Sequence, residues 1–154
     1  MSRDPGLDLR IEEARSFGDY LFLRTLRNQV RHVMTNDTSY IGYLGQLKFY
    51  VAARCKFKRM RAFKVFIARC RSRPVGYLLI RTTQDGALVT TAIDGRFRRQ
   101  GIGKKLVNFA QRSYGDLVAE IRDDNAASIA LHESMGFQRE ARRDGILVYR
   151  FRRQ

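Results

Sequence analysis

The sequence predicts one mixed α/β domain in which helices cover a central sheet. The chain has 154 residues, of which 44% are hydrophobic, so it is long enough for one hydrophobic core. Stretches of alternating polarity, typical of strands, are interspersed with stretches whose apolar residues recur every three or four positions, as in helices. No internal repeat, linker or low-complexity tract divides the chain, so we expect a single domain over residues 1–154.

The first half of the chain is predicted to hold one strand and two helices. Apolar and polar residues alternate over 7–13, which favours a strand. Over 17–34 the apolar residues recur at steps of three and four, which favours a helix. A turn-forming segment over 36–39 precedes a second helix, whose apolar stripe comprises Tyr40, Tyr43, Leu44, Leu47, Tyr50 and Val51.

The second half alternates between strands and helices. Strands are expected over 63–71, 75–82, 88–93, 116–122, 138–143 and 146–151. Helices are expected after Gly101 and over 126–135. The turn signals around Pro74 and Gly86 separate the first three of these strands, which favours antiparallel hairpins.

Several classes of protein are disfavoured by composition. No apolar run approaches the roughly 18 residues of a membrane helix, so no membrane partner is expected. The N-terminal sequence lacks the apolar core of a secretory signal, and two cysteines, Cys55 and Cys70, are too few for a disulfide scaffold. We therefore expect a cytoplasmic protein with reduced thiols and no metal site.

The charge of the chain is strongly unbalanced. Thirty Lys and Arg residues oppose fifteen Asp and Glu residues, which gives a formal net charge of +15. A charge of this size predicts an anionic partner, either nucleic acid, an acidic protein or a polyanionic small molecule. Charge alone does not choose among them. It also leaves open whether the chain is a monomer or a homodimer.

The loop between the strand over 88–93 and the following helix has the composition of a phosphate site. Gly101 and Gly103 let backbone N–H groups approach an anion without a Cβ in the way, and the helix N-terminus adds a positive end. Arg98, Arg99 and Lys104 add cations. The loop lacks the Gly-Lys-Ser/Thr ending of a Walker loop and the third glycine of a dinucleotide-binding fingerprint.

A second motif lies about twenty residues downstream. The loop contains Arg98-Arg99-Gln100-Gly101-Ile102-Gly103, and the second motif is Asn125-Ala-Ala-Ser128-Ile-Ala-Leu131-His132-Glu-Ser-Met-Gly136-Phe137. In this order the two resemble the signatures of the GNAT superfamily of acetyl-CoA-dependent N-acetyltransferases. The resemblance implies a GNAT fold: a mixed, mostly antiparallel sheet of about seven strands flanked by about four helices.

The resemblance also implies an acetyl-CoA site. The residues expected to bind this cofactor are Ile93, Arg98, Arg99, Gln100, Gly101, Ile102, Gly103, Lys104, Asn125 and Ser128. Backbone amides over 99–104 would hold the pyrophosphate, and the strand over 90–93 would pair with the pantetheine arm. Asn125 would bond to pantetheine, although the same side chain is suited to cap the following helix, and the two roles are compatible.

Acyl transfer to an amine needs a neutral amine, stabilisation of an oxyanion and a proton for the departing thiolate. The resemblance assigns the oxyanion to backbone N–H groups over 91–93. It also assigns the general base to Glu120, as in the ribosomal-protein alanine N-acetyltransferases. The alternative for Glu120 is a solvated carboxylate or one paired with Arg122, and Asp94 is a second candidate base.

His132 is the main departure from the family pattern. The family has a tyrosine, the usual proton donor, at this position. An imidazole with an ordinary pKa of about 6.5 suits proton donation at neutral pH. Its alternatives are a packing or hydrogen-bonding role, in which case Tyr114, Tyr149 or water would supply the proton.

The acceptor amine is the least defined part of the site. Arg24, Arg27 and Asn28 lie in a segment similar to the Arg-Asn segment of GNAT enzymes that acetylate nucleotide-linked amino sugars, so the first expectation is a small acceptor of this kind. The second is an N-terminal or lysine amine of an acidic or ribosome-associated protein. The third, of another class, is a non-catalytic nucleic-acid-binding module whose basic segments over 54–64 and 139–153 contact phosphates.

Overall fold

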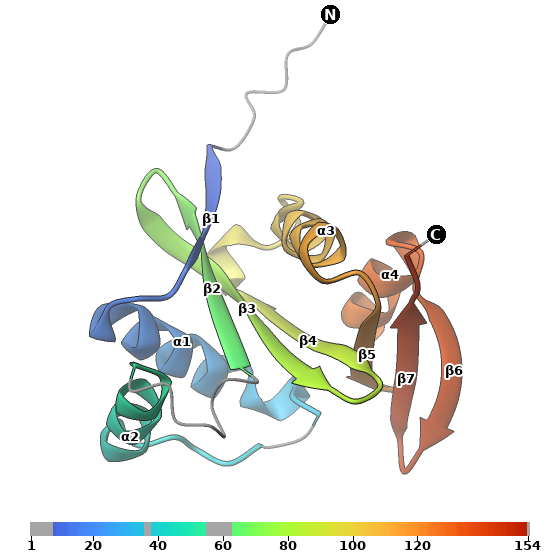
Figure 1. Ribbon diagram of the computed structural model, residues 1–154, viewed down its shortest axis with the longest axis horizontal. Coiled ribbons are helices and arrows are strands. Elements are labelled where there is room, and N and C mark those ends of the chain that lie inside the picture. The colour runs from blue at the N-terminus through green and yellow to red at the C-terminus, as the bar shows by residue number, and fades with distance from the viewer. Residues whose placement is uncertain (1–7, 36–37, 55–62, 154) are drawn as a thin grey trace, which may run out of the picture.

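The structure is a computed structural model that describes residues 8–35, 38–54 and 63–153 (Figure 1). Within these residues, seven strands form one sheet in the order β1-β2-β3-β4-β5-β7-β6. The strands are β1 (Leu9–Glu13), β2 (Phe63–Cys70), β3 (Arg73–Thr83), β4 (Gly86–Ile93), β5 (Leu117–Arg122), β6 (Gln138–Arg143) and β7 (Ile146–Phe151). All neighbours are antiparallel except β4 and β5, so the predicted mixed, mostly antiparallel sheet is confirmed.

In the described part of the chain, four α-helices and two short 3-10 helices accompany the sheet. They are α1 (Phe17–Val30), η1 (Arg31–Val33), α2 (Tyr43–Arg54), η3 (Gly95–Phe97), α3 (Ile102–Tyr114) and α4 (Ala126–Ser134). The helix expected over 17–34 therefore ends as an α-helix at Val30 and tightens into η1. None of the described helices is long and apolar enough to cross a membrane.

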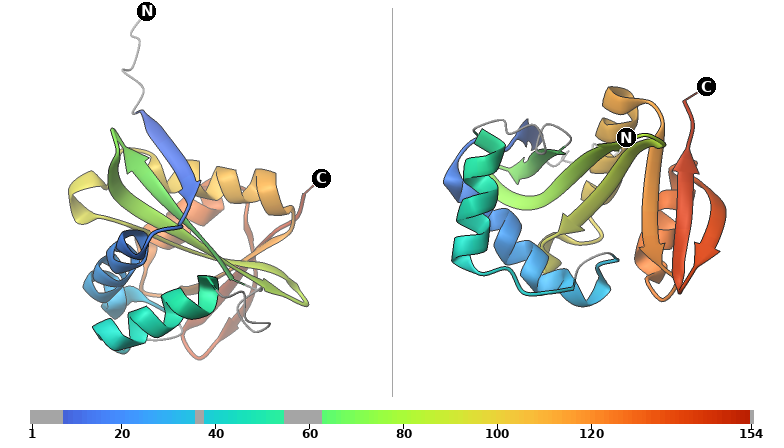
Figure 2. Two further views of the ribbon diagram at one scale, coloured as in Figure 1. Left: turned by 60° about the vertical axis from the view of Figure 1, so that its left-hand side comes forward. Right: turned by 60° about the horizontal axis from the view of Figure 1, so that its bottom comes forward.

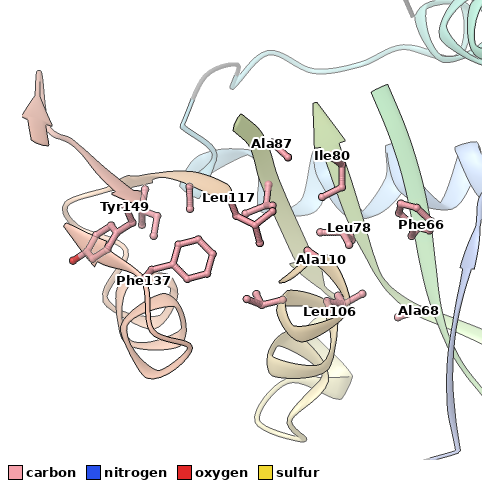
Figure 3. Packing of buried hydrophobic residues seen from close by; sticks show 14 of the residues in the cluster. Phe66, Ala68, Leu78, Ile80, Ala87, Leu106, Ala110, Leu117, Phe137 and Tyr149 are labelled. Carbon is pink, nitrogen blue, oxygen red and sulfur yellow. The ribbon is translucent and has the colours of Figure 1, made fainter. Parts of the chain in front are cut away.

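The helices lie on the two faces of the sheet, and each face has its own core. On one face α3 and α4 cover a cluster that includes Leu78, Leu106, Leu117 and Phe137 (Figure 3). On the other face α1 covers a smaller cluster built around Leu26, with α2 packed outside it (Figure 2). Alternate residues of β2 and β3 therefore enter different cores, as the period of a strand requires.

The sheet opens between its two parallel strands. β4 pairs with β5 only through Ala87 with Leu117 and Leu88 with Val118. On its other edge, β4 is paired with β3 along its whole length, from Gly86 to Ile93. From Val89 onward, the β5-facing edge of β4 therefore lacks a ladder partner, and its backbone groups are available to a ligand.

The apolar stripe expected on the second helix does not face one core. Phe49 and Tyr50 turn toward α1, where Tyr50 contacts Phe17 and both contact Tyr20. The remaining five members of the stripe are exposed, namely Tyr40, Tyr43, Leu44, Leu47 and Val51. The buried side of α2 instead contains Gln46. Periodicity located the helix without identifying the face that is buried.

Candidate active site

The opening between β4 and β5 leads into a cavity of about 1260 Å³. Its walls come from β4, β5, the loop before α3, one side of α4, and the segment around η1. The volume exceeds the roughly 300–1,000 Å³ typical of sites for drug-sized ligands. The cavity therefore has room for an extended cofactor together with part of a second substrate.

The loop before α3 forms a concave backbone surface at one end of this cavity. Arg99 and Gly101 both adopt left-handed conformations, with φ of 61° and 76°. The first intrahelical bond of α3 runs from Lys105 N to Gly101 O, so the N–H groups immediately before Lys105 have no partner within the helix. Successive N–H groups in such a turn at a helix N-terminus form an anion site.

Gly101 and Gly103 are each suited to their positions for a different structural reason. A Cβ on Gly101 would meet no atom within 4 Å, but its backbone angle is one that L-residues rarely adopt. A Cβ on Gly103 would come within 3.1 Å of Leu131 Cδ2, so its absence lets α3 and α4 approach closely. Gly101 therefore shapes the anion surface, whereas Gly103 sets the distance between the helices.

The residues present fit acetyl-CoA. The open backbone surface and the side chains of Arg98, Arg99 and Lys104, which line the cavity, suit a pyrophosphate. The unpaired edge of β4 suits an extended chain with amide groups, because such a chain can complete the strand ladder there. Gln100 is the one predicted cofactor residue that does not line the cavity, and it is exposed.

Asn125 and Ser128 organise the start of α4. Asn125 Oδ1 accepts a hydrogen bond from Ser128 N at 3.2 Å and so caps the helix. Ser128 O in turn accepts from His132 Nδ1 at 2.8 Å. The three residues are linked along one side of the helix, and all three line the cavity.

His132 is held in one protonation form by this arrangement. Because a carbonyl oxygen can only accept, Nδ1 must carry the proton and Nε2 must be a lone-pair acceptor. Nε2 is buried and has no hydrogen-bond partner among the described residues. Burial lowers the pKa of His132, while the bond to Ser128 O opposes that shift. Burial therefore favours the neutral imidazole, and its ring packs edge-on against Phe137.

Glu120 lies on β5, and its side chain is on the face of the sheet opposite to α4. Its neighbours Ala119 and Ile121 point into the core under α3, so strand alternation turns Glu120 toward the face of α1. Glu120 lines the cavity, and its backbone O accepts from Thr35 Oγ1 at 2.8 Å. This bond joins segments 85 positions apart and fixes the end of the η1 segment beside β5.

The remaining candidates for proton transfer lie away from the cavity lining. Asp94 accepts from the backbone and side chain of Arg96, and these bonds lower its pKa to about 2 although burial opposes the shift. Tyr149 donates to Glu133 Oε1 at 2.8 Å, and Tyr114 packs against Phe66.

Cys70 is a free thiol beside the core under α3, and Cys55 lies outside the described residues.

The three residues expected to bind the acceptor mainly hold the segment before α2. Arg24 donates to Ile41 O at 2.8 Å and to the Tyr40 hydroxyl at 2.6 Å. Asn28 exchanges two bonds of 3.0 Å with the backbone of Ile41. Arg27 donates to Ser39 O at 2.6 Å and is the only one of the three that lines the cavity.

The sequence analysis did not identify several residues that line the cavity from distant segments of the chain. His32, Thr35 and Arg81 are polar examples, and Val33, Met34 and Leu79 are apolar ones. Arg81 lies on the same face of β3 as Leu79. Strand alternation therefore places Arg81 on the cavity side once the face that carries Leu79 is known. Thr35 carried no such signal because it follows η1, next to a turn-forming segment.

A profile of the Acetyltransferase (GNAT) family matches residues 35–137, which is about two thirds of the chain. The chain is a member of the GNAT acetyltransferase family. The family and its fold, both expected from the two motifs, are thereby confirmed, as is the family's cofactor, acetyl-CoA.

Individual GNAT proteins resemble the chain over different lengths. The ribosomal protein bS18 alanine N-acetyltransferase of Escherichia coli (strain K12) is 38% identical over 58 residues, which cover 34% of this chain and 39% of that relative. The chain thus matches about two fifths of the length of this curated relative.

Solved structures of GNAT proteins share the whole fold. A ribosomal-protein-alanine N-acetyltransferase from Brucella melitensis has a TM-score of 0.73 at 20% identity, covering 92% of this chain and 98% of its own. A putative acetyltransferase from Salmonella typhimurium, solved with its cofactor acetyl-CoA, has a TM-score of 0.72 at 18% identity, with coverages of 95% and 94%. At these identities the likeness establishes the fold.

Replacing Gly101 tests the anion surface of this GNAT loop. We expect Gly101→Ala to weaken binding of acetyl-CoA and of CoA about fivefold, because a Cβ at this backbone angle costs about 1 kcal/mol. Calorimetric titration at moderate salt measures the change. Gly95→Ala is the matched control, since Gly95 lies in the same loop with space for a Cβ and no positive φ. An equal loss of affinity in both variants would contradict the assignment of the loop as the anion surface.

Proposed function

We propose that this protein is an acetyl-CoA-dependent N-acetyltransferase that transfers an acetyl group to a primary amine by direct attack in a ternary complex. The observation that carries the proposal is the shared cavity. The anion-binding loop, the unpaired edge of β4 and the carboxylate-bearing Glu120 all border it. A cofactor bound along the anion-binding loop and the unpaired edge of β4 would therefore have its far end near Glu120.

The cofactor, when bound, supplies an acetyl group activated as a thioester. Arg98, Arg99 and the N–H groups at the start of α3 would hold its phosphates. Because Oδ1 of Asn125 is engaged in the helix cap, its Nδ2 is the atom we assign to the pantetheine arm. The N–H groups over 91–93 are assigned to the oxyanion.

We assign Glu120 as the general base. It lies on the side of the opening that faces α1, which is where the segment around η1 and Arg27 encloses the cavity. An amine that enters from that side passes Glu120 before it reaches the unpaired edge of β4. The carboxylate oxygen takes a proton from this amine, directly or through water, so that the nitrogen lone pair becomes available.

His132 contributes through Nε2, which is buried, so the ring must turn toward the cavity before this atom acts. In its neutral form this atom has no proton to give, so it can only donate to the leaving sulfur after it has first accepted a proton. We therefore assign Nε2 as a site that holds a proton in transit. Glu120 takes the first proton from the ammonium and later releases it to solvent. After attack, the nitrogen would give a further proton to Nε2, and in a second transfer Nε2 would pass it to the sulfur as the C–S bond breaks. A lowered pKa makes the protonated imidazole a stronger acid, which favours the second transfer.

The acceptor that the geometry supports best is a protein amine, such as an N-terminal alanine. Two of the three residues expected to bind a small nucleotide sugar, Arg24 and Asn28, are instead bonded to the segment over 40–41. That segment continues into an exposed apolar face on α2. The local identity to a ribosomal protein alanine N-acetyltransferase supports the same class of acceptor.

An amino-sugar nucleotide is the second candidate. Arg27 and Arg81 both line the cavity on the side of α1 and suit a diphosphate beside the reacting amine. The non-catalytic alternative, nucleic-acid binding through the basic surface, stays a prediction. Several of its arginines are already paired, as Arg142 is with Asp123 and Arg150 with Glu140.

A Glu120→Gln variant tests the base. With whichever acceptor is turned over, either an N-terminal-alanine peptide or an amino-sugar nucleotide, we expect kcat to fall about a hundredfold, because the variant cannot take the proton. The affinity for acetyl-CoA, measured by calorimetry, should be unchanged. The interaction with Thr35 uses the backbone of Glu120, so this contact survives the substitution. An unchanged kcat would remove Glu120 from the mechanism.

The protonation form of His132 can be observed directly. The chain has two histidines, so a His32→Gln variant leaves only the His132 imidazole in a nitrogen-15 NMR titration. We expect the Nδ1–H form at pH 7 and a midpoint below the ordinary 6.5, because burial disfavours the charged ring. An Nε2–H form, or a midpoint above 6.5, would contradict the role assigned to Nε2.

A further inference from the structure

The exposed apolar side chains of the molecule are concentrated in one place. Among the described residues, the large hydrophobic side chains that are exposed all belong to a set we call the α2 outer face, namely Tyr40, Tyr43, Leu44, Leu47 and Val51. Leu44 is 76% exposed, and even Leu47 is 43% exposed. Scattered exposed apolar residues are ordinary, but a contiguous group on one helix marks an interaction site.

The α2 outer face forms a continuous stripe. Leu44, Leu47 and Val51 are separated by steps of three and four, which places them one above another on the helix. The opposite side of α2 is already occupied by contacts with α1, through Phe49 and Tyr50. The helix lies at the periphery of the molecule, away from α3 and α4 (Figures 1 and 2). A partner therefore reaches the stripe without displacing another described element.

The charges that α2 itself carries have one sign. Lys48 and Arg54 are exposed on α2, and the guanidinium of Arg24 lies 3.8 Å from the ring centre of Tyr43. The sequence has no Asp or Glu between Asp37 and Asp85. Charge complementarity thus calls for a partner that is acidic as well as apolar.

A second copy of the chain fits this face poorly. Two α2 outer faces brought together would oppose Lys48 and Arg54 of one protomer to the same residues of the other, in a chain of net charge +15. An acidic segment meets both the apolar and the charged requirement.

The α2 outer face is continuous with the cavity. Ile41 lines the cavity and lies between Tyr40 and Tyr43 in the chain. From Tyr43 to Val51 the helix advances about 12 Å, which an extended segment spans with about four residues. A segment of about ten residues can therefore place its N-terminal amine in the cavity and its following side chains on the α2 outer face.

We propose that the α2 outer face docks an acidic, leucine- or phenylalanine-bearing segment of the protein that carries the acceptor amine. The proposal rests on the proposed acetyltransferase function and specifies its acceptor as a protein with such a segment. The apolar side chains of the segment cover Leu44, Leu47 and Val51, and its carboxylates face Lys48 and Arg54. A short peptide, which ends before α2, gains nothing from this face.

Binding is tested with a fluorescein-labelled peptide of about twelve residues that begins with alanine and then alternates Glu and Leu. We expect Leu44→Ser/Leu47→Ser to weaken binding at least about tenfold and Lys48→Glu about fivefold. Arg112→Glu, the matched control, makes the same charge change at an exposed position of α3 and should leave binding unchanged. A peptide with Ser in place of Leu should bind weakly to every variant.

Kinetics separate docking from catalysis. For the unlabelled long peptide, Leu44→Ser/Leu47→Ser should raise KM about tenfold, with kcat and the affinity for acetyl-CoA unchanged. For a tripeptide that begins with alanine, neither kcat nor KM should change. If neither peptide is acetylated but an amino-sugar nucleotide is, the docking proposal fails while the acetyltransferase function stands. If acetyl-CoA itself does not bind, the proposed function fails.

Other occupants of the face give distinct results, each of which overturns the proposal. A dimer in light scattering that Leu44→Ser/Leu47→Ser converts to a monomer would assign the face to a second copy. Binding to vesicles of phosphatidylcholine and phosphatidylglycerol that the same variant abolishes, without peptide binding, would assign it to a lipid surface. Equal peptide binding by Lys48→Glu and Arg112→Glu would reduce the interaction to the general charge of the chain.

Discussion

The early end of the pairing between β4 and β5 is the constraint on which the site depends. Only two residue pairs join these parallel strands, while β4 stays paired with β3 to Ile93 and β5 with β7 to Arg122. The sheet is thus continuous at one end of the opening and divided at the other. The division exposes strand edges in the interior, where a ligand can complete the ladder.

The opening also connects the two faces of the sheet. The loop before α3 and His132 belong to the side of α3 and α4, whereas Glu120 and Thr35 belong to the side of α1. An intact sheet would keep these groups apart. The divided sheet places them around one cavity, so that a cofactor and an amine can enter from opposite faces and meet between the strands.

Local features of the site were predictable from the sequence. The glycines of the loop over 98–103 were expected to let backbone N–H groups approach an anion, and in the structure Gly101 has a positive φ, which glycine adopts readily. Asn125 was expected to cap α4, and it does. Both predictions rely on interactions within a few residues, which a sequence specifies directly.

Features that depend on distant contacts were not predictable. The bond from Thr35 to Glu120 joins segments brought together only by the fold. Arg24 and Asn28 resembled substrate-binding residues, yet they are bonded to Ile41, because a side chain that suits an anion also suits a backbone carbonyl. The stripe of α2 had the spacing of a core-facing helix, and spacing does not say which protein covers it.

Amide hydrogen exchange in the presence and absence of CoA tests the central claim most directly. If CoA occupies the opening between β4 and β5, exchange should slow over 89–93 and 99–104 and stay unchanged over β6, because only the first two segments offer N–H groups to the cofactor. Unchanged exchange in both segments, or protection spread over the basic strands β6 and β7, would contradict the account and indicate a general affinity for anions.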